Sequence, residues 1–152
     1  MKELALNENG LPDRKFYRAL TGNRRIQDGK ICHVTDEWID NVRDWYNSDE
    51  PAGPCPWDVQ QSVEIMLQNN REFATTEKSL GFVPEYSQVG DSIAIFEGAS
   101  VPLVIRKRND TSPLREAWSL VGECYIEGLM EGEFVDRMAS QQDFKGQNIC
   151  IM

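Results

Sequence analysis

The sequence predicts an α+β fold, with a small antiparallel β-barrel or curled sheet over about residues 71–127 and N-terminal helices packed on it. Two apolar runs rich in β-branched residues, 92–97 and 101–106, flank a short connection and predict a β-hairpin. Both runs are apolar on both faces, which is typical of strands covered on both sides. The hairpin is therefore expected to form the core of the sheet, with Phe96 and Leu103 buried.

Three helices are predicted before the sheet. Asp13 can cap the first helix and Gly22 can end it, Thr35 can cap the second, and Pro56 suits the first turn of the third. The stretch 23–34 between the first two helices is expected to be loop, in which Lys30–Val34 could make a brief extended piece. Because these helices carry few apolar side chains, we expect them to pack on the β part rather than to build a core of their own.

The whole chain is expected to form a single domain with three parts. The sequence predicts a helical part over 13–70, a β part over 71–134 and a frayed, polar tail over 139–152. Turns are expected at 77–78 and at the polar cluster 109–113.

Two side-chain patterns predict buried faces. Alternation along 118–127 predicts a half-buried strand, with Leu120 on its inner, more apolar face. In the second helix, Trp38, Trp45 and Tyr46 recur at helical spacing and are expected to be core. The alternative for this aromatic stripe is an exposed groove for a partner peptide.

Composition argues against several classes of partner. The net charge of −9 is spread over both halves of the chain and would repel a phosphate backbone, so no nucleic-acid partner is expected. No apolar run approaches the ~20 residues that cross a bilayer, so we expect no membrane partner and a cytoplasmic location. The 4 cysteines are far apart and there is 1 histidine, which favours reduced thiols over a zinc site.

Two groups of side chains are candidates for catalysis. Glu123, Glu127, Glu131 and Glu133 could form a hydrolase pair or a cation site. The first two would lie roughly 13 Å apart along an extended strand, too far for a retaining pair, so a solvated or capping role is favoured. Cys32-His33 could be a nucleophile beside a base, but adjacent residues rarely face each other and a third orienting group is not evident.

One ion pair is predicted from the hairpin register. Asp91 stands at the entrance of the first strand and Arg106 closes the second. If the hairpin is in register, their side chains meet, and we expect this pair to have a structural role.

Three segments match a family pattern in order and spacing. Residues 71–84 resemble "RRFF-T-G-GLGP", residues 88–106 resemble "GD-v-v-l-G-vP-vLR", and residues 121–133 resemble "vGe-YvhGiMdGE". These segments are similar to the C-terminal region of fungal heterokaryon-incompatibility (HET domain) proteins. The matching residues, called here the family-motif residues, are expected to be structural or to mediate interactions. They are Gly81, Pro84, Gly90, Asp91, Gly98, Pro102, Arg106, Gly122, Glu123, Tyr125, Gly128, Met130, Gly132 and Glu133.

The resemblance implies a function, and the sequence also departs from the family pattern. The "LSYvWG"-like motif of the signalling HET domain does not occur in this chain, and Glu127 stands where the family usually has histidine. The resemblance therefore implies a non-catalytic accessory, regulatory or protein-interaction module of an allorecognition and programmed-cell-death protein. A protein partner or an upstream HET signalling domain is expected, with no cofactor, metal or enzymatic activity. The alternative is a small stand-alone enzyme or ligand-binding β-barrel.

Overall fold

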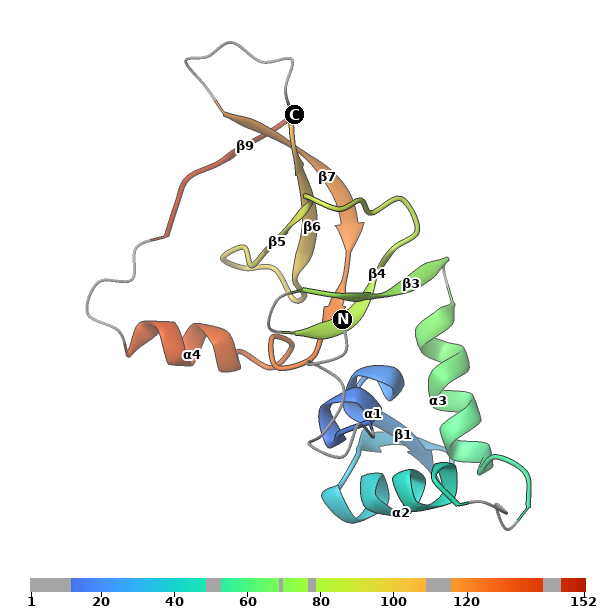
Figure 1. The fold of residues 1–152 in the computed structure, drawn as a ribbon. Helices are drawn as coiled ribbons and strands as arrows, with labels where there is room; N and C mark the ends of the chain where they lie inside the picture. Colours follow the sequence, from blue (N-terminus) through green and yellow to red (C-terminus); the bar gives the residue numbers. More distant parts are fainter. Residues whose placement is uncertain (1–11, 49–52, 69, 77–78, 109–115, 141–145) are drawn as a thin grey trace.

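A computed structural model describes residues 12–48, 53–68, 70–76, 79–108, 116–140 and 146–152. Helices and a short hairpin form one end of the molecule, and two further sheets form the other (Figure 1). This arrangement confirms the α+β class, with curled sheets that do not close into a barrel among the described residues. The turns expected at 77–78 and 109–113 lie outside those residues. No helix in the described part has the length and apolarity that crossing a bilayer requires.

The three N-terminal helices begin where the sequence predicts. Their bounds are Arg14–Thr21 for α1, Asp36–Tyr46 for α2 and Trp57–Leu67 for α3. The side chains of Asp13 and Thr35 accept backbone N–H bonds at the starts of α1 and α2, and Pro56 precedes α3. Gly22 ends α1 with a left-handed φ of 64°, a conformation that glycine adopts without steric cost.

A β-hairpin occupies the stretch that was expected to be loop. Strands β1 (Arg24–Gln27) and β2 (Lys30–His33) pair antiparallel through a two-residue turn. The turn residues Asp28 and Gly29 have φ of 51° and 72°. Positive φ at both positions is the geometry that an Asp-Gly dipeptide favours between twisted strands. The loop expectation was therefore wrong for β1, because the Asp-Gly signal outweighs the polarity of the flanking residues. The extended piece expected at Lys30–Val34 is strand β2.

The helical part builds its own apolar core, contrary to expectation. Its buried side chains are Tyr17, Val34, Trp38, Ile39, Val42 and Val59. Trp38 also donates from Nε1 to Asp58 at 2.7 Å and so ties α2 to α3. The prediction that the aromatic stripe is core is correct only for Trp38. Trp45 is half-buried, and Tyr46, the last residue of α2, is 62% exposed.

Helices α1 and α3 also pack on the β part. Met66 near the end of α3 is buried with Phe82 and Tyr125, and Leu20 of α1 packs against the same cluster. This cluster joins the helical core to the sheets and fits the expectation that the N-terminal helices cover the β part.

In the described residues after α3, the chain forms seven strands and one helix. The bounds are β3 Arg71–Thr75, β4 Leu80–Pro84, β5 Ser92–Ala94, β6 Leu103–Lys107, β7 Ala117–Glu123, β8 Tyr125–Ile126, α4 Glu133–Ala139 and β9 Cys150–Ile151. The strands form one sheet of order β3-β4-β8 and another of order β5-β6-β7-β9. All these strand pairs are antiparallel except β7 with β9.

The central hairpin has shorter strands and a longer connection than predicted. Ala94 pairs with Leu103, so residues 95–102 form the loop. Pro102 has no N–H to donate to the ladder, and its carbonyl oxygen instead accepts the N–H of Cys124 at 3.0 Å. Phe96 and Leu103 are consequently half-buried, which corrects the expectation that both are core. The buried side chains of the hairpin are those of Val104 and Ile105.

One continuous stretch of chain serves both sheets. Strand β7 pairs with β6, the strand is interrupted at Cys124, and β8 then pairs with β4. The register with β6 shifts at Val121, since Val104 faces Gly122 whereas Ile105 faces Leu120. This irregularity interrupts the alternation, so Leu120 is 53% exposed and the expectation that it faces inward was wrong.

Part of the tail that was predicted to be frayed forms a strand. Residues Cys150–Ile151 form β9 in parallel with the first residues of β7, and the N–H of Met152 donates to Trp118 O at 2.9 Å. The outer edge of β7 offers unpaired backbone groups, and the apolar end of the tail supplies a matching strand.

The two sheets meet where the chain carries glycine. A Cβ on Gly81 would lie 1.9 Å from the carbonyl oxygen of Tyr125, and one on Gly122 would lie 2.8 Å from Cγ of Pro84. Strand β4 can therefore approach β8 only because residue 81 has no side chain.

We expect Gly81→Ala to lower the free energy of unfolding. Overpacking costs roughly 1–3 kcal/mol, and the loss should reach or exceed the upper end of this range because the atom in the way belongs to the backbone. Urea unfolding followed by tryptophan fluorescence measures the loss. Gly146→Ala is the matched control, since a Cβ there meets nothing within 4 Å. Equal midpoints for the two variants would contradict the close approach of β4 and β8.

Candidate functional site

The best-defined polar arrangement in the β part is the ion pair between Arg106 and Asp91. Arg106 lies in β6, and Asp91 directly precedes β5, beside it in the hairpin register. Nε donates to Oδ1 at 2.8 Å and Nη2 to Oδ2 at 2.9 Å, so both carboxylate oxygens are bound. The Asp91 side chain is only 7% exposed. The sequence-based prediction of this pair is confirmed.

The ion pair also fixes the connection between β4 and β5, called here the β4–β5 loop (residues 85–90). Arg106 donates from Nη2 to the carbonyl oxygen of Tyr86 at 2.7 Å, and Asp91 accepts the N–H of Gln88 at 2.8 Å. The N–H of Asp91 in turn donates to Gln88 O at 3.0 Å, and that of Ser87 to Pro84 O at 2.9 Å. One guanidinium therefore sets the path of the whole loop.

Hydrogen bonding lowers the pKa of Asp91. The largest cause is the bond from Arg106, which stabilises the carboxylate, and the N–H of Gln88 acts in the same direction, whereas burial opposes both. The carboxylate raises the pKa of Arg106 by the same contact. Both groups therefore favour the charged pair.

The other family-motif residues are placed at turns and packing contacts. The junction of the sheets is formed by Gly81, Pro84, Gly122 and Tyr125. Burial there is the main cause that raises the pKa of the Tyr125 phenol. Met130 packs against the cluster of Met66, Phe82 and Tyr125. Positive φ occurs at the motif glycines Gly90, Gly98, Gly128 and Gly132. The structure thus does not gather these residues in one cavity. Several lie at the junction and Gly90 lies in the clamped loop, whereas Gly98, Gly128 and Gly132 lie outside both.

The four candidate glutamates differ in their surroundings, and three of them, Glu127, Glu131 and Glu133, lie close enough to Tyr125 to raise its pKa. Glu123 is exposed at the end of β7, and Glu133 accepts the N–H of Glu131 at 2.8 Å in the turn before α4. Glu131 pairs with His33 of β2 at 3.1 Å. Burial is the largest cause that raises the pKa of Glu127, while Lys15 and Arg18 of α1 act against it.

The Cys32-His33 dipeptide does not have the geometry of a nucleophile and its base. The thiol of Cys32 lies 3.7 Å from the carbonyl oxygen of Arg25, whereas His33 contacts Glu131. Within the described ranges, no three or more His, Cys, Asp or Glu side chains are arranged to hold a metal ion. Burial raises the pKa of Cys124 to about 12, which keeps this thiol protonated at neutral pH.

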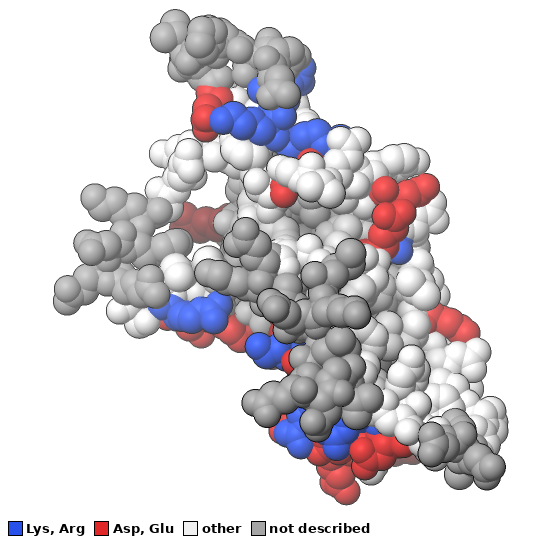
Figure 2. All heavy atoms as spheres, viewed as in Figure 1, with Lys and Arg blue, Asp and Glu red and all other residues white. Residues whose placement is uncertain are grey.

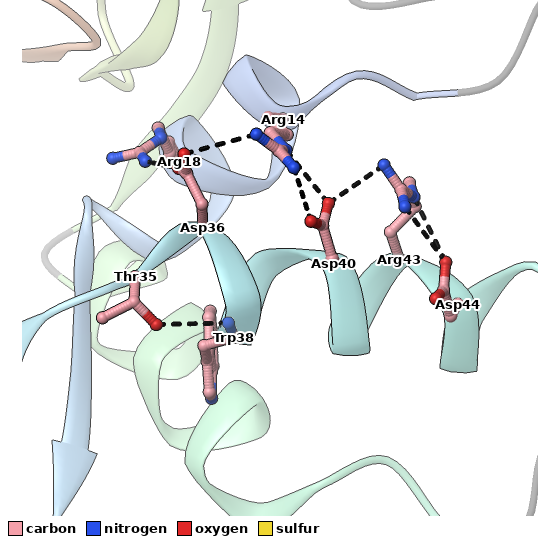
Figure 3. Close-up of polar contacts among 8 residues, drawn as sticks. All are labelled: Arg14, Arg18, Thr35, Asp36, Trp38, Asp40, Arg43 and Asp44. Atoms are coloured by element: carbon pink, nitrogen blue, oxygen red, sulfur yellow. Dashed lines mark hydrogen bonds and ion pairs between the residues drawn. The ribbon is translucent and has the colours of Figure 1, made fainter.

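A second polar cluster joins α1 to α2 (Figure 3). Arg14 donates from Nε to Asp40 at 3.0 Å and also contacts Asp36. Arg18 binds Asp36 as well, and Arg43 forms an ion pair with Asp40 at 3.0 Å. These side chains lie at the surface, where blue and red atoms mix in Figure 2. Exposed pairs of this kind position helices but add little stability singly.

Sequence reasoning missed two exposed side chains on the β4–β5 loop. Tyr86 is 74% exposed and Val89 is fully exposed at 109%. The available signal was an apolar pair in a short segment bracketed by Pro84 and Gly90, where no core face could accept it. Two surface depressions are present elsewhere, one along residues 147–150 with Glu116 and one along 12–15 with Arg43, and neither contains a family-motif residue.

Comparison with known proteins assigns the family. The Het-6 beta-barrel domain matches residues 61–145, which is more than half of the chain and runs from α3 to beyond α4. The chain therefore belongs to the Het-6 beta-barrel domain family. It is also 33% identical over 81 residues to heterokaryon incompatibility protein 6, OR allele, of Neurospora crassa. That stretch covers 51% of this chain and 11% of the Neurospora protein. No solved structure matches.

We expect Asp91→Asn to lower the free energy of unfolding at pH 7 by about 1.5–3 kcal/mol, because charge-assisted hydrogen bonds are lost. The pKa of Asp91 is lower in the native state than in the unfolded state, where it is about 3.9. The stabilisation that Asp91 provides is therefore fully present above the unfolded pKa and is lost as the pH falls through the native pKa. Urea unfolding between pH 7 and pH 3 should therefore show the gap between the two proteins closing in acid.

The control is Glu97→Gln, at an exposed position of the hairpin loop. It should leave the pH profile close to that of the unchanged protein. A gap between Asp91→Asn and the unchanged protein that stays constant from pH 7 to pH 3 would rule out an ionised Asp91 as the stabilising group.

Proposed function

We propose that this chain is a non-catalytic accessory and protein-interaction module of a fungal heterokaryon-incompatibility protein. The observation that carries the proposal is the match of the Het-6 beta-barrel domain to residues 61–145. The similarity to the Neurospora incompatibility protein supports the same context. Within that context the module acts in non-self recognition and programmed cell death in the cytoplasm, through a protein partner or an upstream HET signalling domain.

The placement of the family-motif residues supports a scaffold rather than a reaction centre. Gly81 and Gly122 allow close backbone approach, and Asp91 and Arg106 use their charges on each other and on a loop. Groups that are saturated by structural contacts hold a surface in a fixed shape. Such a surface is what a binding module needs.

The proposal that the chain is not an enzyme is tested with NAD. HET signalling domains show a remote likeness to TIR domains, some of which cleave NAD, so NAD is the most informative substrate. We expect no nicotinamide release above the buffer rate when the purified chain is incubated with NAD. Release that disappears in Glu123→Gln or Glu127→Gln would overturn this part and favour a catalytic barrel.

The interaction role is tested with the full-length Neurospora heterokaryon incompatibility protein 6 as the probe. We expect the purified chain to bind the immobilised probe in biolayer interferometry, with saturable and reversible signals. An unrelated acidic protein of similar size and net charge controls for electrostatic adsorption. Signals no larger than those of this control would contradict the proposed interaction role.

A further inference from the structure

The β4–β5 loop carries the two most exposed large hydrophobic side chains among the described residues. Val89 is exposed at 109% and Tyr86 at 74%, and the next is Ile31 at 64%. Isolated surface hydrophobic residues are common and need no explanation. Here, however, two of them occur within one short loop.

Hydrogen bonds from outside the loop hold its backbone in place. Arg106 reaches across from β6 and binds the carbonyl of Tyr86, the residue whose ring projects. At the same end of the loop, Glu85 donates its N–H to Asn70 O at 2.9 Å and accepts from the Asn70 side chain at 2.8 Å. Toward the other end, the N–H of Gln88 donates to the Asp91 carboxylate at 2.8 Å. A loop fixed at both ends displays its side chains in one arrangement, so little conformational entropy is lost when they are bound.

The shape and charge of the loop define what it can bind. The connection from β4 to β5 projects outward from the sheets (Figure 1), so its binding partner must be concave. Tyr86 and Val89 require an apolar pocket, and tyrosine is enriched among the residues that dominate binding energy. Acidic atoms gather beside this connection in Figure 2, and Glu85 is exposed there. The net charge of −9 further favours a basic partner surface.

We propose that the β4–β5 loop is a preorganised recognition element that inserts Tyr86 and Val89 into an apolar pocket with a basic rim on a folded partner protein. The inference rests on the proposed interaction role and names the surface that performs it. The Arg106–Asp91 pair is then a positioning device, since it sets the loop without touching the partner.

The test measures binding of loop variants to the full-length Neurospora heterokaryon incompatibility protein 6. We expect Tyr86→Ser and Val89→Ser each to weaken binding by about tenfold or more, as expected for side chains at the centre of an interface. Both side chains are exposed, so the thermal unfolding of these variants should match that of the unchanged chain. Ile31→Ser is the matched control, because Ile31 is exposed on β2 in the helical part, and its binding should not change.

A third variant tests positioning separately from contact. Arg106→Lys keeps the positive charge but loses the two-pronged bond, so the loop is less well held while both tip side chains remain. We expect faster amide hydrogen exchange across 86–90 and weaker binding, in a protein that still folds.

The outcomes separate the two proposals. Loop variants that bind as tightly as the unchanged chain would overturn the recognition loop and leave the interaction role standing. Failure of the unchanged chain to bind the probe would overturn the interaction role itself, and with it the partner assigned to the loop. Weakening by Ile31→Ser equal to that by Tyr86→Ser would also overturn the assignment to this loop.

Discussion

The close approach of strands β4 and β8 is the constraint on which the β part depends. The stretch from Ala117 to Ile126 belongs to both sheets, so the sheets can curl around a shared interior only if its second half reaches β4. That contact exists because Gly81 leaves room for the Tyr125 carbonyl. The same junction buries Phe82 against Met66 of α3, so the position of the helical part also follows from it. The missing side chain at residue 81 therefore allows the strand pairing that lies next to this cluster.

Two sets of family-motif residues have distinct structural roles. One set closes the sheet junction, and the other, centred on Arg106, holds the β4–β5 loop. The apolar tip of that loop, Tyr86 and Val89, is excluded from both tasks and is open to solvent. Side chains at this tip are free to differ between proteins without disturbing the sheets, because no structural contact of theirs would be lost.

Features set by local chemistry could be predicted from the sequence, and features set by distant contacts could not. Asp13 and Thr35 cap helices through bonds within one turn, and the Asp91–Arg106 pair follows from the hairpin register. The bulge at Val121 and the burial of Tyr125 depend on a second sheet that the alternation pattern does not reveal. At the candidate site, both charged residues were predicted. The bond from Arg106 to a loop carbonyl was not, because it depends on the path of a loop.

The parallel strand β9 has a consequence for the order in which the chain can fold. The helical core is built from residues 16–59, so its contacts can form as soon as that part of the chain is available. The sheet of β5, β6 and β7 receives a further strand from Cys150–Ile151, which follows all its other strands in the sequence. During synthesis the two ends of the molecule therefore mature at different times, and the β7 edge is uncovered in between. In that interval the nascent protein offers an open strand edge to chaperones or to neighbouring chains.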